Sequence, residues 1–141
     1  MPISARLAAV VDALPLTPQM RVLEIGCGPG VAARAVADRL TTGHILATDR
    51  SASAIAQARA GSVTQLADGR LSLRQVAAED LELVEGEEPF DLAFAIRVGA
   101  LDGRHPELGD RVLSRLAGML TPTGRLLIDG GDPLRELVVP R

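Results

Sequence analysis

Three glycines and two acidic residues form the part of this sequence best suited to chemistry. Gly26, Gly28 and Gly30 alternate with other residues directly after a short apolar run. Glycine allows a positive φ angle and lets a ligand approach the backbone without a Cβ in the way. Glu24 lies two residues before the first glycine and would attract a cation such as an amino group. Asp49 ends a second apolar run, where a carboxylate can accept both hydroxyls of a ribose.

The spacing of the glycines distinguishes between nucleotide-like ligands. A dinucleotide fingerprint needs G-x-G-x-x-G, whereas Val31 stands three residues after Gly28 and the pattern here is G-x-G-x-G. Glu24 would also repel a pyrophosphate, so an NAD-dependent oxidoreductase is disfavoured. A ligand that carries a ribose and an ammonium but no phosphate fits S-adenosylmethionine. The structural alternative, in which the glycines only shape a tight turn, explains less of this pattern.

The elements that must position these residues follow from hydrophobic patterning. Short β-branched runs bounded by turn residues predict strands, and apolar residues at helical spacing predict helices. Ser4 is the expected N-cap of the first helix, and a turn is expected at 121–124. The predicted helices cover residues 3–14, 31–40, 51–60 and 108–120, and the predicted strands cover residues 21–25, 44–49, 71–76, 90–96 and 125–129.

The alternation of strands and helices predicts the fold class. Strands that are apolar on both faces and separated by helices are typical of a parallel sheet covered by helices on both sides. We therefore expect a single α/β domain over residues 1–141. Its sheet would be doubly wound, mainly parallel and built of about five strands. Ligands bind such sheets beyond the carboxyl ends of the strands, which is where the glycine loop lies.

The sequence VLEIGCGPG at residues 22–30 resembles the first motif of class I S-adenosylmethionine-dependent methyltransferases. The similarity continues through residues 47–51, 78–81, 89–93 and 116–129, so it covers nearly the whole chain in the right order. The first motif is specific, and the later ones are individually weak. The resemblance implies a Rossmann-like methyltransferase fold, shortened at the C-terminus, with S-adenosyl-L-methionine as its cofactor.

The resemblance also implies which residues hold the cofactor. Glu24 would help to hold the methionine ammonium, and Asp49 would bind the ribose hydroxyls. Arg50 would cover the adenine, and Cys27 is expected to be a small loop residue rather than a reactive one. The expected cofactor-binding residues are Glu24, Gly26, Cys27, Gly28, Gly30, Asp49, Arg50, Ala78, Glu79 and Ile96.

The acceptor side of the expected site carries few candidate residues. His105 is the candidate catalytic general base, although the structural alternative of a polar turn before a helix is favoured. Arg97 and Arg104 would either bind an acidic substrate or pair with Asp102 and Glu107. The Asn/Asp-Pro-Pro-aromatic motif typical of methyltransferases acting on nucleobase amino groups is absent after the fourth strand. We therefore expect a small-molecule acceptor.

The sequence departs from the family pattern in two places. Ala77 stands where an adenine-binding Asp is common, so either Glu79 or Asp80 replaces that contact or the cofactor binds more weakly. The family usually adds two strands after the fifth, whereas residues 132–141 hold at best one short strand at 136–139. An unpaired fifth strand invites pairing. We expect either the last residues to fold back onto it or a second copy to cover it in a homodimer.

Composition and charge exclude several classes of protein. Of the 141 residues 47% are hydrophobic and 23% charged, which is typical of soluble globular domains. All 15 basic residues are Arg, so there is no phosphate-loop or Schiff-base lysine. A net charge of −3 and the absence of Trp and Tyr argue against nucleic-acid binding. One Cys and two His cannot form a zinc cluster, and no apolar run could span a membrane. We expect a cytoplasmic protein with no metal.

The expected function is therefore methyl transfer from S-adenosylmethionine to a small molecule that the sequence does not identify. The alternative is a non-catalytic protein that binds S-adenosylmethionine or S-adenosylhomocysteine, or a partner subunit of a larger complex. The missing C-terminal strands and the few acceptor-side residues favour this alternative. A binding protein would keep its affinity for the cofactor but would turn over no acceptor.

Overall fold

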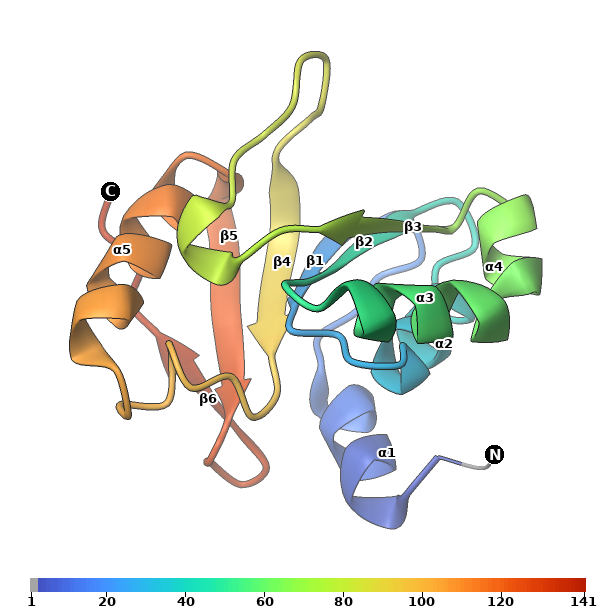
Figure 1. Ribbon diagram of the computed structural model, residues 1–141, viewed down its shortest axis with the longest axis horizontal. Helices are drawn as coiled ribbons and strands as arrows, with labels where there is room; N and C mark the ends of the chain where they lie inside the picture. Colours follow the sequence, from blue (N-terminus) through green and yellow to red (C-terminus); the bar gives the residue numbers. More distant parts are fainter. Residues whose placement is uncertain (1–2) are drawn as a thin grey trace.

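The computed structural model describes residues 3–141, which form one six-stranded sheet with helices packed against it (Figure 1). The strands are β1 (Arg21–Ile25), β2 (His44–Asp49), β3 (Leu71–Gln75), β4 (Phe90–Ala95), β5 (Leu120–Asp129) and β6 (Leu134–Leu137). Their order in the sheet is β3-β2-β1-β4-β5-β6, so strand order reverses between β1 and β4. Neighbouring strands are parallel except β5 and β6, which are antiparallel.

The helices begin where the sequence offers caps. The Ser4 side chain accepts the N–H of Leu7, and the Ser51 side chain accepts the N–H of Ala54, which satisfies one free donor at each helix start. The helices of the described residues are α1 (Ala5–Ala13), α2 (Val31–Ala37), α3 (Ala52–Gly61), α4 (Val63–Ala67) and α5 (Pro106–Ala117), with a 3-10 helix, η1 (Ala78–Asp80).

Helices cover both faces of the sheet. On one face α1, α2 and α3 pack against strand residues that include Val22 and Phe94. On the other face α5 packs through Val112 and Leu116 against residues that include Leu23. This arrangement confirms the predicted doubly wound α/β fold of the Rossmann-like methyltransferase type.

The alternation of side chains along β1 sets the position of its acidic residue. Successive side chains of a strand point to opposite faces. Glu24 therefore projects on the same side as Val22, which is the side covered by α1 and α2. Val22 to Ile25 are all buried, so the carboxyl group of Glu24 lies inside the protein at the end of the central strand.

Several predicted boundaries are corrected by the structure. The sheet has six strands rather than about five, because residues 134–137 form β6. Residues 121–124, expected as a turn, belong to β5, which pairs with β4 on both sides of a register shift between Phe90 and Leu92. Helix α4 lies where no helix is expected, since its five residues are too few to show helical spacing.

The edge of β5 is covered within the chain. β6 pairs with β5 from Leu126 opposite Leu137 to Asp129 opposite Leu134. Arg125 and Glu136 form an ion pair between the two strands, with 2.9 Å between nitrogen and oxygen. The expectation that the last residues fold back is confirmed. The edge of β5 that was expected to pair with a second copy is already paired with β6, and a homodimer stays a prediction without support here.

A buried hydroxyl joins the ends of β1 and β2. Thr48 is 1% exposed, and its Oγ1 donates to the carbonyl oxygen of Glu24 at 2.9 Å. The carbonyl oxygen of Thr48 accepts the N–H of Cys27 at 2.8 Å. Together these bonds hold the start of the glycine loop against the end of β2.

Replacing Thr48 by Val should lower the free energy of unfolding by about 1 kcal/mol, because it removes a buried hydrogen bond without changing the shape of the side chain. Urea unfolding followed by circular dichroism measures this difference. Thr64→Val, on the exposed surface of α4, is the matched control and should stay within about 0.5 kcal/mol of the wild type. Equal stability of the two variants would contradict the role given to Thr48.

Candidate functional site

The loop between β1 and α2 is built on positive φ angles. Gly26, Gly28 and Gly30 have φ values of 72°, 54° and 88°. The N–H of Gly28 donates to Oδ2 of Asp49 at 2.9 Å, so a carboxylate at the end of β2 holds the loop that follows β1. A Cβ built on Gly28 would meet no atom within 4 Å. The loop therefore combines a fixed backbone with open space beside it.

Glu24 is a buried carboxyl group with an unsatisfied oxygen. It is 2% exposed, and within the described residues its Oε1 has no hydrogen-bond partner. Burial, and secondly the negative charge of Asp49, raise the pKa of Glu24 from 4.5 to about 8. The side chain lines a cavity below the glycine loop. A buried carboxyl group with an unpaired oxygen thus belongs to the lining of a cavity that a cationic group of a ligand could fill.

Asp49 ends β2 with both of its oxygens already engaged by backbone donors. Oδ2 accepts from Gly28, and Oδ1 accepts the N–H of Ser51 at 2.9 Å. Each carboxylate oxygen has a second lone pair, so Asp49 can still accept hydroxyl groups of a ligand. The backbone bonds fix its orientation before any ligand binds.

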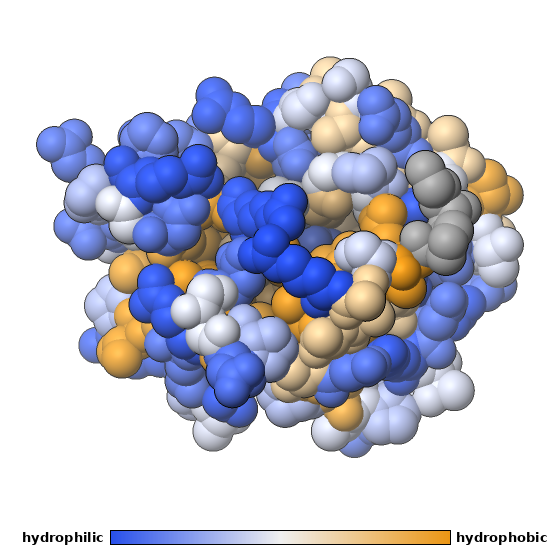
Figure 2. Space-filling view, turned by 90° about the horizontal axis from the view of Figure 1, so that it is seen from below, coloured by the Kyte–Doolittle hydropathy of each residue, from blue (hydrophilic) through white to orange (hydrophobic). Residues whose placement is uncertain are grey.

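Two cavities open at the carboxyl ends of the strands. The first, of about 270 Å³, lies between the glycine loop and α1. The second, of about 500 Å³, lies between the end of β2 and the segments that follow β3 and β4. Cavities of this order bind small molecules in many proteins. Gly26 and Arg97 line both cavities, so the two meet there. Figure 2 shows this face of the molecule, with hydrophilic side chains over its middle and apolar ones beside them.

Nine of the ten predicted cofactor-binding residues lie at these cavities. Gly30 is the exception. It is the N-cap of α2, and a Cβ there would come within 3.0 Å of Ala58 and of the Arg34 guanidinium, so it allows close packing behind the loop. The first cavity is lined by Glu24, Gly26, Cys27, Gly28 and Ile96, and the second by Gly26, Asp49, Arg50, Ala78 and Glu79.

The two acids that follow Ala77 have different surroundings. Glu79 lines the second cavity. Asp80 is exposed and pairs with Arg111 of α5 at 3.2 Å. Glu79 is therefore the acid positioned to replace the contact that Ala77 lacks.

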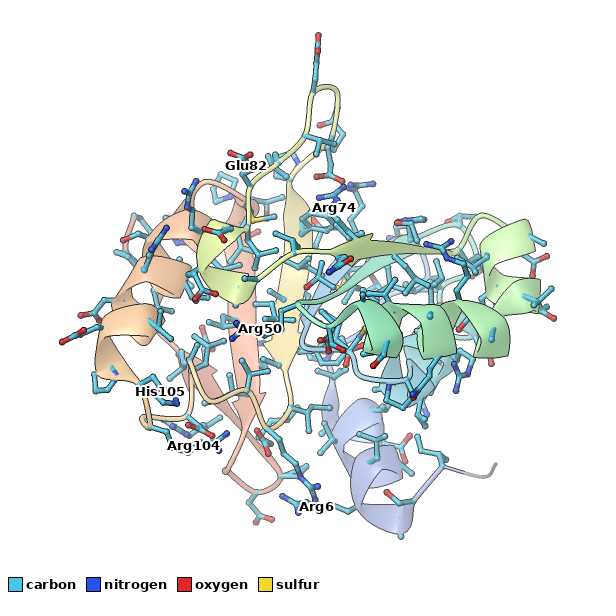
Figure 3. All side chains as sticks on the ribbon, in the orientation of Figure 1. Arg6, Arg50, Arg74, Glu82, Arg104 and His105 are labelled. Atoms are coloured by element: carbon cyan, nitrogen blue, oxygen red, sulfur yellow. The ribbon has the colours of Figure 1, made fainter. Side chains whose placement is uncertain are left out.

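His105 also lines the second cavity, next to Arg104. It is the N-cap residue of α5, and its side chain makes no capping hydrogen bond. A Cβ on Gly99 would lie 3.3 Å from the imidazole ring, so the ring rests on that glycine. Figure 3 shows Arg104 and His105 together at the lower edge of the molecule, where the strands end. The structure thus brings the candidate base to the site while leaving it exposed.

Cys27 has the surroundings of an inert thiol. It is 6% exposed, and burial, followed by the charges of Glu24 and Asp49, raises the pKa of Cys27 to about 12. A thiol that stays protonated is a poor nucleophile. This agrees with the expected role of a small loop residue.

Helix α1 also belongs to the site. The pattern of its sequence does not indicate this position. Arg6, Leu7 and Val10 of this helix line the first cavity opposite Glu24. An Arg6 nitrogen lies 3.8 Å from Oδ2 of Asp129 at the end of β5, and Arg6 itself is exposed. The one signal in the sequence is a basic residue in the first turn of a largely apolar helix.

Two further features bear on the kind of site. Among residues 3–141 no cluster of three or more His, Cys, Asp or Glu side chains could hold a metal ion. No helix in this range is both long and apolar enough to cross a membrane.

Comparison with known proteins finds a family and several proteins that are similar to this chain. A family model described as "Methyltransferase domain" matches residues 16–138. Trans-aconitate 2-methyltransferase from Methylobacterium nodulans is 33% identical over 131 residues, which are 92% of this chain and 45% of that protein. The chain thus spans about half the length of the curated relatives it matches.

Solved structures share the fold at lower identity. Phosphoethanolamine N-methyltransferase 1 from Haemonchus contortus, in complex with phosphoethanolamine and S-adenosylhomocysteine, has a TM-score of 0.74 at 21% identity, covering 89% of this chain and 25% of that one. The cyclase SpnF has a TM-score of 0.71 at 25% identity, covering 86% of this chain and 42% of that one. Because the family model matches most of its length, this chain belongs to the methyltransferase-domain family.

Proposed function

We propose that this protein binds S-adenosylmethionine across the two cavities and transfers its methyl group to a small molecule. The observation that carries the proposal is Glu24, a residue of the lining of the first cavity whose buried Oε1 lacks a partner in the described residues. The ammonium of the methionine part is a cation that would satisfy this acceptor. Membership of the methyltransferase-domain family supports the same function.

The residues around the first cavity match the methionine part of the proposed cofactor. Glu24 would hold its ammonium, and Arg6 across the cavity would hold its carboxylate. The ion pair of Arg6 with Asp129 is long, with 3.8 Å between the atoms, and Arg6 is exposed, so the pair competes little with a ligand. Open space beside Gly28 allows the ligand to approach the backbone. The backbone at Ile96 would close the other side.

The second cavity matches the adenosine part. We assign the ribose hydroxyls to Asp49, which the loop backbone already orients. Arg50 would cover the adenine ring, and Ala78 and Glu79 would flank its edge. Gly30 would contribute indirectly, without contacting the cofactor, because its lack of a side chain allows α2 to start close to α3. These assignments use residues from three strand ends, which the parallel sheet brings to one edge.

The chemistry at the site would need positioning more than proton transfer. When bound, S-adenosylmethionine supplies a methyl group on a positively charged sulfur, which is a good leaving group. The protein then has to hold an acceptor in line with that methyl group and exclude water. His105 would act as a general base where the acceptor carries a proton on its oxygen.

A second candidate function is cofactor binding without catalysis. Among the residues that line the second cavity, the acceptor side offers a single exposed histidine as base. The cyclase SpnF has the same fold, so the fold alone does not establish methyl transfer. In either case we propose that residues 1–141 act as one domain. A cytoplasmic location is proposed because Cys27 is free and buried.

Titration with S-adenosylhomocysteine tests cofactor binding, and calorimetry is suitable because the chain has no Trp or Tyr for fluorescence. We expect binding in roughly the micromolar range. Asp49→Ala should weaken it by about ten-fold or more, because the ribose loses its acceptor and Gly28 loses its anchor. Asp110→Ala, an exposed change on α5, should bind like the wild type. No binding by the wild-type protein would refute the proposed function.

Glu24→Gln should change how stability depends on pH. The folded protein keeps the Glu24 proton up to a pKa of about 8, whereas the unfolded chain releases it near 4.5. Between these values the unfolded state gains stability as the pH rises, so the wild type loses up to about 1.4 kcal/mol per pH unit through this group. The variant should lack this decrease in the free energy of unfolding. Urea unfolding at several pH values measures the decrease in both proteins.

The same variant should lose cofactor affinity. A neutral amide cannot form an ion pair with the ammonium, so we expect S-adenosylhomocysteine to bind about ten-fold or more weakly at pH near 8. If the free energy of unfolding of Glu24→Gln fell with rising pH as steeply as that of the wild type, Glu24 would not be the titrating group. It would not be the ammonium partner if the affinity were unchanged.

A further inference from the structure

Arg97 holds a distinctive place between the two cavities. It is the one residue other than glycine with a positive φ, 59°, among residues 3–141. It follows Ile96 after the end of β4 and lines both cavities, as Gly26 does. Its N–H donates to Oδ1 of Asp129 at 3.0 Å, so the end of β5 fixes the backbone of the segment after β4.

The backbone of Arg97 is in the left-handed conformation at a place where the residue lines both cavities. A residue with a Cβ seldom adopts this conformation, which persists where surrounding contacts hold it. The hydrogen bond to Asp129 is such a contact. Strained backbone of this kind gathers at ligand sites. The result is an exposed arginine in the lining of both cavities, where the two meet.

The second cavity is lined by three arginines and by two carboxylates, those of Asp49 and Glu79. Arg50, Arg97 and Arg104 all line the second cavity. Arg104 pairs with Asp102 at 2.8 Å, whereas no ion pair of Arg50 or Arg97 occurs in the part of the chain that the structure describes. Figure 3 shows Arg50 near the middle of the view and Arg104 toward its lower edge, on separate segments of the chain.

The carboxylates of the second cavity do not neutralise Arg97. Asp49 accepts two backbone N–H groups and is assigned to the ribose, and Glu79 is assigned to the adenine edge. Asp129 bonds the Arg97 backbone N–H, and its other oxygen faces Arg6. The guanidinium of Arg97 is thus left for a further ligand.

The proposed cofactor would add a positive charge at the same place. Its sulfur joins the adenosyl and methionyl parts, so the junction of the two cavities is the place open to it. A sulfonium and the Arg97 guanidinium repel each other, and an anion between them would offset this repulsion by attracting both. We infer that the acceptor is a carboxylic acid whose carboxylate Arg97 binds at this junction. The inference rests on the proposed function.

A carboxylate acceptor also explains why the acceptor side of the site has few candidate general bases. One of its oxygens forms the new O–C bond with the methyl carbon, and the electron pair of the broken C–S bond stays on sulfur. The products are a neutral methyl ester and a neutral thioether. No proton has to be removed, since a carboxylate is already ionised at neutral pH. His105 is then not required as a base.

Binding to protein saturated with S-adenosylhomocysteine tests the inference without turnover. The probes are trans-aconitate, citrate and succinate, each compared by calorimetry with its neutral methyl ester and with inorganic phosphate. We expect at least one of the acids to bind, and its ester and phosphate to bind at least about ten-fold more weakly.

Two substitutions at Arg97 isolate the side chain. Arg97→Gln and Arg97→Gly should each weaken binding of that acid by about ten- to a hundred-fold and leave the affinity for S-adenosylhomocysteine unchanged. Glycine tolerates the positive φ, so the Gly variant should fold at least as stably as the wild type. Arg59→Gln, which removes an exposed arginine on α3, is the matched control and should bind normally.

Each contrary result has a distinct meaning. The inference is overturned if no acid binds, if an ester or phosphate binds as tightly as the acid, or if the Arg97 variants bind it normally. Loss of S-adenosylhomocysteine affinity in the Arg97 variants would also overturn it, by assigning Arg97 to the carboxylate of the cofactor. Failure of the wild type to bind S-adenosylhomocysteine would instead overturn the proposed function.

Discussion

The carboxyl group of Glu24, buried at the end of the central strand, is the constraint on which the rest of the site depends. An acceptor without a partner inside a protein costs free energy unless it takes up a proton or meets a cation. With a pKa raised to about 8, Glu24 meets this demand by keeping its proton when no ligand is present. The surrounding bonds hold the carboxyl group and the loop in place for a cationic ligand, through Thr48 on its carbonyl and Asp49 on Gly28.

The sheet topology explains how residues far apart in sequence reach this group. Parallel strands end at the same edge, and the order reverses between β1 and β4, which opens a cleft there. Glu24 and Asp49 come from two neighbouring strand ends, and Arg97 follows the strand on the other side. Asp129, from the end of β5, holds Arg97 by its backbone. One edge of the sheet thus carries a site for a cation, a ribose and an anion.

Local patterns in the sequence were sufficient for the fold class and for most residues of the cleft. The spacing of the glycines and the acidic residues at strand ends are both patterns of residues close together in sequence. They can therefore be recognised without a structure. The packing of α1 beside the glycine loop, and with it the role of Arg6, depends on tertiary contacts, and a basic residue on a largely apolar helix is its one local signal. The left-handed backbone of Arg97 was equally hidden, because nothing in its residue type indicates a positive φ. Residues 121–124 have the composition of a turn, yet pairing with β4 makes them part of a strand.

The pairing of Glu24 with the cofactor ammonium is tested most directly by the proton balance of S-adenosylhomocysteine binding. Calorimetric titrations near pH 7 in buffers with different ionisation enthalpies measure how many protons are released. Because Glu24 with a pKa of about 8 is mostly protonated at this pH, binding of the ammonium should release about one proton per ligand. The release should fall toward zero above about pH 9. Binding at pH 7 without proton release would contradict the pairing.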